Sequence, residues 1–231
     1  MARRFWQNCG MRFIPSPNFN ARRAGSSVQH LILHYTGMQT AAEATQRLCD
    51  PSAEVSAHYV VDTNGATVQL VEEAERAWHA GKSFWAGETD INSTSIGIEI
   101  VNPGHEFGYV PFPPEQISAM IKLCQEILSR HAIPSHHVLA HSDIAPVRKM
   151  DPGELFPWGE LAAAGVGLWP AQKTADEKRR TENALTEYGY DISNLPAAIT
   201  AFQRHFRPEK INGEWDSECA TKLTWLIQQK I

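Results

Sequence analysis

The chain has 231 residues, of which 42% are apolar and 20% are charged, and its formal net charge at pH 7 is −5. This composition is that of a folded globular protein and excludes a disordered chain. The negative net charge argues against a nucleic-acid partner, because binding to phosphates needs a concentrated basic surface.

The N-terminal twenty residues carry positive charge but no apolar stretch of the kind that a secretion signal needs. The chain as given is therefore predicted to be cytoplasmic, with a periplasmic location as the alternative if a leader has been removed. No apolar run is long enough to cross a bilayer, so no transmembrane segment is expected. The cysteines form no Cys-x-x-Cys pair, which disfavours a thiolate metal site and predicts free thiols at Cys9, Cys49, Cys124 and Cys219.

The first predicted elements are a strand, a helix and a hairpin. An apolar run over residues 28–35 predicts a buried strand. Residues 40–50 have a helical pattern that stops before Pro51. Two runs rich in β-branched residues surround Asn64-Gly65, a dipeptide that favours a tight hairpin turn.

The next elements are a strand over 95–102, an amphipathic helix within 113–134 and a short strand over 136–141. Pro114 suits the first turn of the helix. The apolar face of this helix is expected to hold Ile117, Met120, Ile121, Cys124 and Leu128. Because strands and helices interleave, we predict an α/β fold with a mixed central β-sheet flanked by helices.

The composition changes after about Gly165, where small, polar and charged residues gather. We predict a catalytic domain over 1–170, a linker over 171–180 and a small C-terminal three-helix domain over 181–231. The helices of this last domain are expected at 181–188, 195–205 and 217–229.

Chemically reactive side chains lie where predicted strands end. His34 is near the end of the first strand, His141 ends the strand over 136–141, and Asp151 follows an irregular loop. Two imidazoles and a carboxylate with an open fourth position form the arrangement of a catalytic zinc site. The spacing alone leaves an alternative open, in which His34 is a core histidine bonded to the backbone and Asp151 caps a turn.

Two further charged residues fit the same hypothesis. Lys149 precedes Asp151 by two residues, so on an extended segment both side chains point the same way and the ammonium could stabilise an oxyanion. Glu99 is an acid within an apolar strand and is a candidate general base. The alternatives are a solvated Lys149 or one paired with Glu154, and a Glu99 that is exposed on the polar face of its strand.

The chain contains five stretches of note, in this order: LILHYTG, SAHYVVDTNG, AWHAG, NSTSIGIEIVN and HSDIAPVRKMDPG. These stretches resemble, in the same order, the zinc-dependent N-acetylmuramoyl-L-alanine amidases, including the anhydro-muropeptide amidases. The resemblance covers about residues 15–170 and implies the fold of the related peptidoglycan recognition proteins. It further implies that His34, His141 and Asp151 bind zinc, that Glu99 is the catalytic base and that Lys149 stabilises the transition state.

The C-terminal part, over about residues 181–231, contains YGYDISN, AITAFQRHFRP and INGEWD. These stretches resemble the three-helix peptidoglycan-binding module. Together, the two resemblances imply that the partners are peptidoglycan or muropeptide fragments. The apolar residues of the tail also suit a small core, so the tail could instead pack on the catalytic domain.

Three residues near these motifs are candidates for substrate binding. Tyr35 follows His34 in the first motif, and His79 lies in AWHAG, where it could line the cleft or hold a loop in place. Arg148 could bind a substrate carboxylate through two hydrogen bonds, or it could be a solvated surface residue.

Three more residues lie in loops close to these motifs. Asp143 is expected to fix its own turn rather than bind metal. The loop aromatics Trp85 and Trp158 could edge the substrate groove.

The resemblance implies an amidase that cleaves the bond between N-acetylmuramic acid, or its 1,6-anhydro form, and L-alanine of the stem peptide. The alternative is a non-catalytic peptidoglycan recognition protein, which the same fold supports. A serine or cysteine hydrolase ranks last, because the chain has no Gly-x-Ser-x-Gly motif and no cysteine in the context of a nucleophile.

Overall fold

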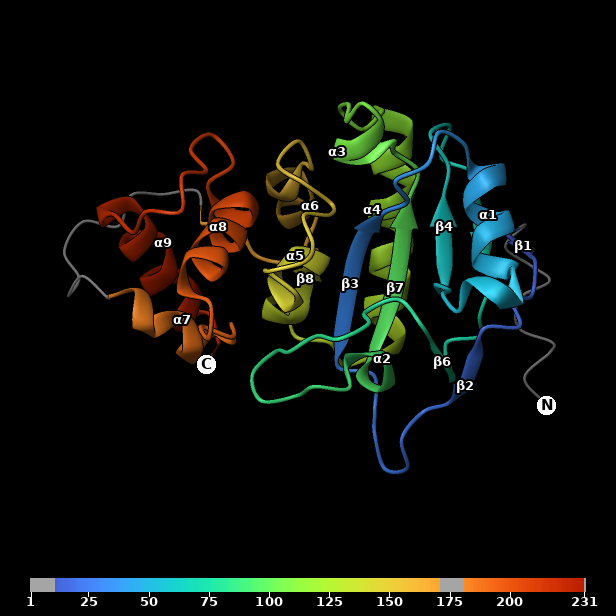
Figure 1. Ribbon diagram of the computed structural model, residues 1–231, viewed down its shortest axis with the longest axis horizontal. Helices are drawn as coiled ribbons and strands as arrows, with labels where there is room; N and C mark the ends of the chain where they lie inside the picture. The colour runs from blue at the N-terminus through green and yellow to red at the C-terminus, as the bar shows by residue number, and fades with distance from the viewer. Residues whose placement is uncertain (1–10, 171–180, 231) are drawn as a thin grey trace.

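The computed structural model describes residues 11–170 and 181–230. A six-stranded sheet lies at its centre, in the order β1-β5-β4-β7-β3-β8, and a two-stranded ribbon of β2 and β6 lies beside it (Figure 1). Strands β4, β7, β3 and β8 run parallel to one another, whereas β5 is antiparallel to β4. The predicted mixed sheet is therefore confirmed. The strands are β1 (Arg12–Phe13), β2 (Phe19–Ala21), β3 (His30–Tyr35), β4 (Tyr59–Val61), β5 (Thr67–Gln69), β6 (Glu75–Ala77), β7 (Ser95–Ile100) and β8 (Val138–Ala140).

Helices cover both faces of the sheet. The long helix α4 lies behind β3 and β7 in Figure 1, and the three C-terminal helices lie together beyond α5 and α6. None of the described helices is long and apolar enough to cross a membrane. The helices are α1 (Ala41–Cys49), α2 (Ile91–Thr94), α3 (Gly104–Phe107), α4 (Pro114–Arg130), α5 (His141–Ile144), α6 (Trp158–Ala163), α7 (Leu185–Tyr188), α8 (Leu195–Phe206) and α9 (Ser217–Gln228).

The central strand β3 is buried on both faces, which explains its nearly continuous apolar sequence. Leu31 and Leu33 belong to the same core cluster as the buried face of α4. Ile32 belongs to a second cluster, which contains residues of the C-terminal helices. Because side chains alternate along a strand, His34 points to the same face as Ile32, away from α4.

The hairpin and the α4 helix follow the sequence patterns. Strands β4 and β5 pair antiparallel around the turn at Asn64-Gly65, where Gly65 has a φ of +81°. The buried face of α4 is centred differently from the prediction, because Leu123 and Ile127 are buried whereas Ile121 and Leu128 are only partly buried. The apolar residues of α4 spread over a wide arc of the helix, and contact with the sheet buries only one part of that arc.

The C-terminal helices share a hydrophobic cluster with the sheet and its loops. In this cluster Ile32, Leu139 and Ile144 pack together with residues of all three helices. Trp85 and Trp158 are 0% and 2% exposed, so the expectation that they edge the substrate groove is wrong. Both rings instead contact side chains of the C-terminal region, Trp85 at Tyr190 and Trp158 at His205.

The segments around the predicted linker are partly described. Val166 is fully buried in the core with α4, and Trp169 packs against the same core, so ordered packing continues to residue 169. Residues 171–180, which carry the linker prediction, lie outside the described residues, as does Cys9. The three described cysteines are free thiols, as predicted; Cys124 and Cys219 are buried and Cys49 is half-buried.

Candidate active site

Parallel pairing brings the predicted site residues to one level of the sheet. His34 lies opposite Glu99 in the pairing of β3 with β7. Leu33 lies opposite Ala140 in the pairing of β3 with β8, so His141 follows at the level of His34. Residues opposite each other in a parallel pair point to the same face. His34, Glu99 and His141 therefore share one face of the sheet.

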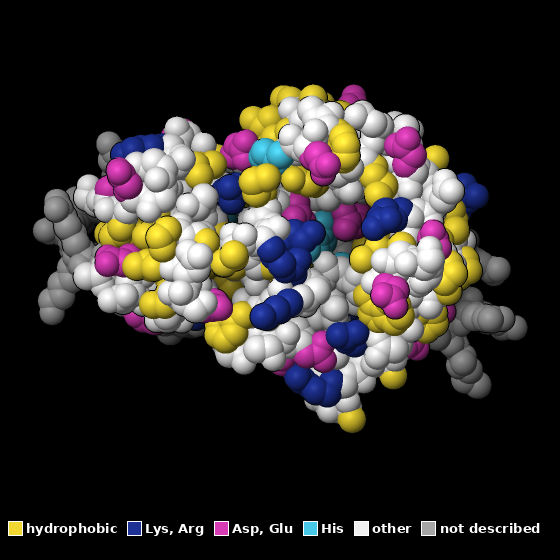
Figure 2. Space-filling model, viewed as in Figure 1, with side chains coloured by type: hydrophobic (Ala, Val, Ile, Leu, Met, Phe, Trp, Pro, Cys, Tyr) yellow, Lys and Arg dark blue, Asp and Glu magenta, His cyan; other side chains and the backbone are white. Residues whose placement is uncertain are grey.

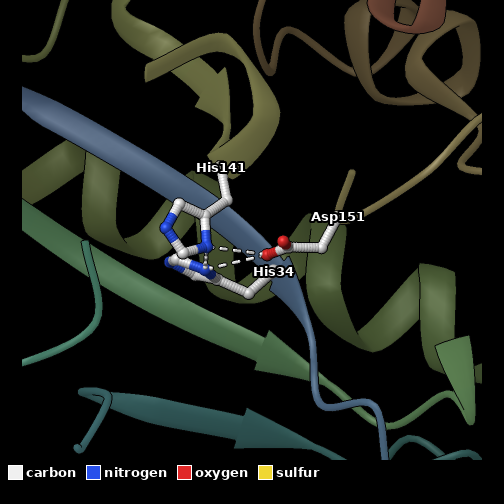
Figure 3. A group of neighbouring side chains, drawn as sticks. All are labelled: His34, His141 and Asp151. Carbon is white, nitrogen blue, oxygen red and sulfur yellow. Dashed lines mark hydrogen bonds and ion pairs between the residues drawn. The ribbon is translucent and has the colours of Figure 1, made fainter. Parts of the chain in front are cut away.

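His34, His141 and Asp151 point toward one another (Figure 3). Nδ1 of His34 lies 2.8 Å from Nδ1 of His141 and 3.1 Å from Oδ2 of Asp151. Nδ1 of His141 lies 2.9 Å from the same carboxylate oxygen. All three residues are buried. Three atoms that can ligate a metal thus converge from separate elements, as a catalytic metal site requires.

A chain of hydrogen bonds determines which nitrogen of His34 is free. The Ser95 hydroxyl donates to the carbonyl of Ile91 at 2.6 Å, so its oxygen accepts from Nε2 of His79 at 3.1 Å. Nδ1 of His79 is then an acceptor, and Nε2 of His34 donates to it at 3.0 Å. This leaves the lone pair of His34 on Nδ1, the atom that faces the other two ligands.

The same reasoning applies to His141. Its Nε2 lies 3.2 Å from the carbonyl oxygen of Ala80, which can only accept, and 3.3 Å from Nη2 of Arg148, which already donates to that carbonyl. Because Nδ1 is the atom that faces His34 and Asp151, ligation through Nδ1 leaves the proton on Nε2. Burial lowers the pKa of His34 to about 4, so this imidazole is neutral near neutral pH. Two imidazole nitrogens and one carboxylate match the ligands that zinc prefers.

Glu99 lies beside His34, His141 and Asp151 and has one carboxylate oxygen that accepts no hydrogen bond from a described residue. Its Oε2 atom is buried and has no hydrogen-bond partner among the described residues. Burial and the nearby charge of Asp151 raise the pKa of Glu99 well above its usual value, whereas Lys149 opposes this shift. A buried carboxylate oxygen without a partner is costly, and such atoms gather at functional sites. Glu99 is not exposed on a polar strand face.

The candidate ligands and Glu99 lie at the bottom of a cleft of about 430 Å³. Figure 2 shows this hollow, with histidine and acidic side chains at its floor and Lys and Arg side chains at its rim. Lys149 is half-buried and lines the cleft. Glu154, its alternative partner, instead accepts from Nε2 of His105 at 3.1 Å. The Lys149 side chain lines the cleft and forms no ion pair with a described residue.

The comparisons with known proteins agree with this geometry. The sequence profile of N-acetylmuramoyl-L-alanine amidase matches residues 24–154. The N-acetylmuramoyl-L-alanine amidase AmiD of Escherichia coli (strain K12) is 40% identical, over an alignment that covers 90% of this chain and 86% of AmiD. The chain belongs to the N-acetylmuramoyl-L-alanine amidase family.

Two solved structures with bound ligands resemble the fold of this amidase. The complex of Escherichia coli AmiD with anhydro-N-acetylmuramic acid-L-Ala-D-γ-Glu-L-Lys has a TM-score of 0.78 at 39% identity and covers 87% of this chain and 89% of AmiD. AmpDh3 of Pseudomonas aeruginosa with anhydromuramic pentapeptide has a TM-score of 0.78 at 34% identity, with coverages of 88% and 92%. At these coverages each match includes part of the C-terminal helices.

The three substrate-binding candidates of the amidase lie at different depths. The Tyr35 hydroxyl lies 3.0 Å from Nδ1 of His105 at the cleft wall. Arg148 also lines the cleft, but its guanidinium donates to the backbone carbonyls of Lys82 and Ala80. His79 is buried, and its Nδ1 accepts a hydrogen bond from Nε2 of His34. The substrate roles of all three stay predictions.

Sequence reasoning did not anticipate the contact between His79 and His34. We expect His79→Ala to weaken zinc binding by about 10- to 100-fold, because it removes the acceptor that holds the tautomer and orientation of His34. The measurement is the zinc dissociation constant, obtained by competition with a chelator. His30→Ala is the control, because His30 is a buried histidine of the same strand that bonds Thr94 instead. Equal zinc affinity in both variants would contradict the orienting role.

Proposed function

We propose that this amidase is a zinc hydrolase that cleaves the amide bond between N-acetylmuramic acid, or its 1,6-anhydro form, and L-alanine of the stem peptide. The observation that carries the proposal is the convergence of two imidazole lone pairs and one carboxylate beside the unpartnered Oε2 of Glu99. The relatives named above supply the substrate class, because two of their structures hold anhydromuramic peptides.

His34, His141 and Asp151 would hold the metal. Bound zinc would supply a water of lowered pKa and polarise the scissile carbonyl. Oε2 of Glu99 accepts the proton of the attacking water and then delivers it to the leaving nitrogen of L-alanine. The Lys149 ammonium approaches the carbonyl oxygen as negative charge develops there.

The rim of the cleft suits an anionic peptide. Arg47, Arg148 and Lys149 all line it, and stem peptides carry free carboxylates. Two of the donor nitrogens of Arg148 are already bonded to backbone carbonyls, so it would offer a carboxylate its remaining donors. Tyr35, which also lines the cleft, would contact the substrate as well.

The described residues give little support to a cysteine hydrolase. Burial raises the pKa of Cys124 to about 12 and also raises the pKa of Cys49 and Cys219, so none is present as a reactive thiolate. A non-catalytic receptor would need neither the unpartnered Oε2 of Glu99 nor a Lys149 ammonium that pairs with no acid among the described residues. Peptidoglycan binding by the C-terminal helices and the compartment, cytoplasm or periplasm, stay predictions from the sequence.

The decisive experiment is incubation with a defined anhydro-muropeptide and analysis of the products by mass. We expect free anhydro-N-acetylmuramic acid and an intact stem peptide that begins with L-alanine. Binding without any product would favour the receptor, and cleavage at another bond would assign a different hydrolase.

Lys149→Ala tests the proposed oxyanion contact. An ammonium that meets the oxyanion only in the transition state should affect kcat and kcat/KM together, with KM nearly unchanged. The expected loss is about 10²–10³-fold in kcat. Zinc content should stay as in the unmodified enzyme, because lysine is not a ligand. Lys149→Arg should restore little, since a planar guanidinium does not place its charge where an ammonium does. An unchanged kcat in Lys149→Ala would end this assignment.

A further inference from the structure

Asp143 joins the C-terminal helices to the segment that carries a metal ligand. It is fully buried in α5, two residues after His141. Its Oδ2 accepts from the backbone N–H of Ala140 at 2.8 Å and from Nδ1 of His205 at 2.6 Å. Its Oδ1 accepts from the Tyr190 hydroxyl at 2.6 Å. Two of these three donors therefore belong to the C-terminal region.

Both C-terminal donors are held by aromatic packing. The His205 ring stacks on Trp158 with a centroid distance of 3.7 Å and on Phe206 at 3.8 Å. The Tyr190 ring packs edge-on against Trp85 at 4.9 Å. Because these rings are buried, the positions of the imidazole N–H and the phenol O–H are set by packing and not by solvent.

Hydrogen bonds of the backbone around Asp143 connect it to two of the three candidate ligands, His141 and Asp151. The bond from Ala140 ties the carboxylate to the residue that precedes His141. The backbone N–H of Ser142 donates to the carbonyl of Asp151 at 3.0 Å. A shift of α5 would therefore move His141 and Asp151 relative to His34, which is anchored separately in β3.

We infer that the C-terminal helical region positions the metal site through Asp143 and is thus a structural part of the catalytic unit. Tyr190 and His205 are positioning residues, because they act on the ligands only through this carboxylate. The inference rests on the proposed zinc function. Loss of the Tyr190 hydroxyl leaves Oδ1 without a partner, and loss of His205 leaves Oδ2 with the Ala140 N–H alone. In either case the turn that carries His141 relaxes.

The chain offers a matched pair of variants. Tyr188 and Tyr190 are both buried and both pack edge-on against Trp85, but among the described contacts only Tyr190 bonds Asp143. We expect Tyr190→Phe to raise the zinc dissociation constant by about 10-fold and to lower kcat with little change in KM. We expect Tyr188→Phe to leave all three quantities unchanged. Zinc affinity is measured by competition with a chelator, and thermal unfolding of the metal-free proteins shows that both variants are folded.

A second pair tests the other donor. His205→Asn keeps an amide N–H near the position of Nδ1, whereas His205→Leu fills the space without a donor. Zinc affinity should be closer to that of the unmodified protein in His205→Asn than in His205→Leu. If the unmodified protein binds no zinc, the proposed function itself is wrong. If it binds zinc and Tyr190→Phe matches Tyr188→Phe, only the positioning role is overturned.

Discussion

Removal of the metal is expected to abolish hydrolysis of the anhydro-muropeptide, and addition of zinc is expected to restore it. Without a metal, no divalent cation polarises the carbonyl or lowers the pKa of the attacking water, so Glu99 faces an unactivated water and only the Lys149 ammonium remains near the carbonyl oxygen. The protein should stay folded, because His34 and His141 are held by His79 and by the Ala80 carbonyl independently of any ion. The measurements are metal content, turnover and the circular dichroism spectrum before and after dialysis against a chelator.

Magnesium serves as the control for the metal experiment. It prefers oxygen ligands in an octahedral arrangement, which a site with two imidazoles does not offer. Recovery with zinc but not with magnesium therefore ties activity to the nitrogen ligands. Full turnover by protein that contains no metal would exclude the role assigned to His34, His141 and Asp151.

Glu99→Gln is expected to lose about 10²–10⁴-fold in kcat, the range for removal of a general base. Glutamine has nearly the same shape, so fold and zinc content should be retained, but its amide cannot accept the proton of the water. The raised pKa of Glu99 suits this role, because a carboxylate that holds a proton more tightly is a stronger base.

Glu106→Gln is the matched control, because Glu106 is an exposed acid that lines the same cleft at its rim. It should keep kcat within about twofold, as surface substitutions usually do little. The measurement is kcat of both variants, with zinc content determined on the same samples. A Glu99→Gln enzyme as fast as Glu106→Gln would mean that another group takes the proton.

Sequence patterns that depend only on neighbouring residues, such as turn dipeptides and helical periodicity, allowed much of the fold to be predicted. The hairpin at Asn64-Gly65 and helix α8 occur where turn chemistry and helical periodicity placed them. The short strands β1, β2 and β6 and helices α2 and α3 were not predicted, because two to four residues carry no measurable periodicity. Their ends are set by tertiary hydrogen bonds, such as those from the Arg22 guanidinium to the carbonyls of Asn92 and Ser95.

By itself, the sequence determined the alternation of strands and helices and, through its motifs, the family and the candidate ligands. Only the tertiary structure decided how these ligands are supported. His79 bonds His34 across 45 residues of sequence, and His205 bonds Asp143 across 62. Such contacts leave no periodic trace in the chain, because they depend on how two separately folded elements pack. For the same reason, the sequence shows neither which nitrogen of His34 carries a proton nor that Trp85 lies buried against the C-terminal region.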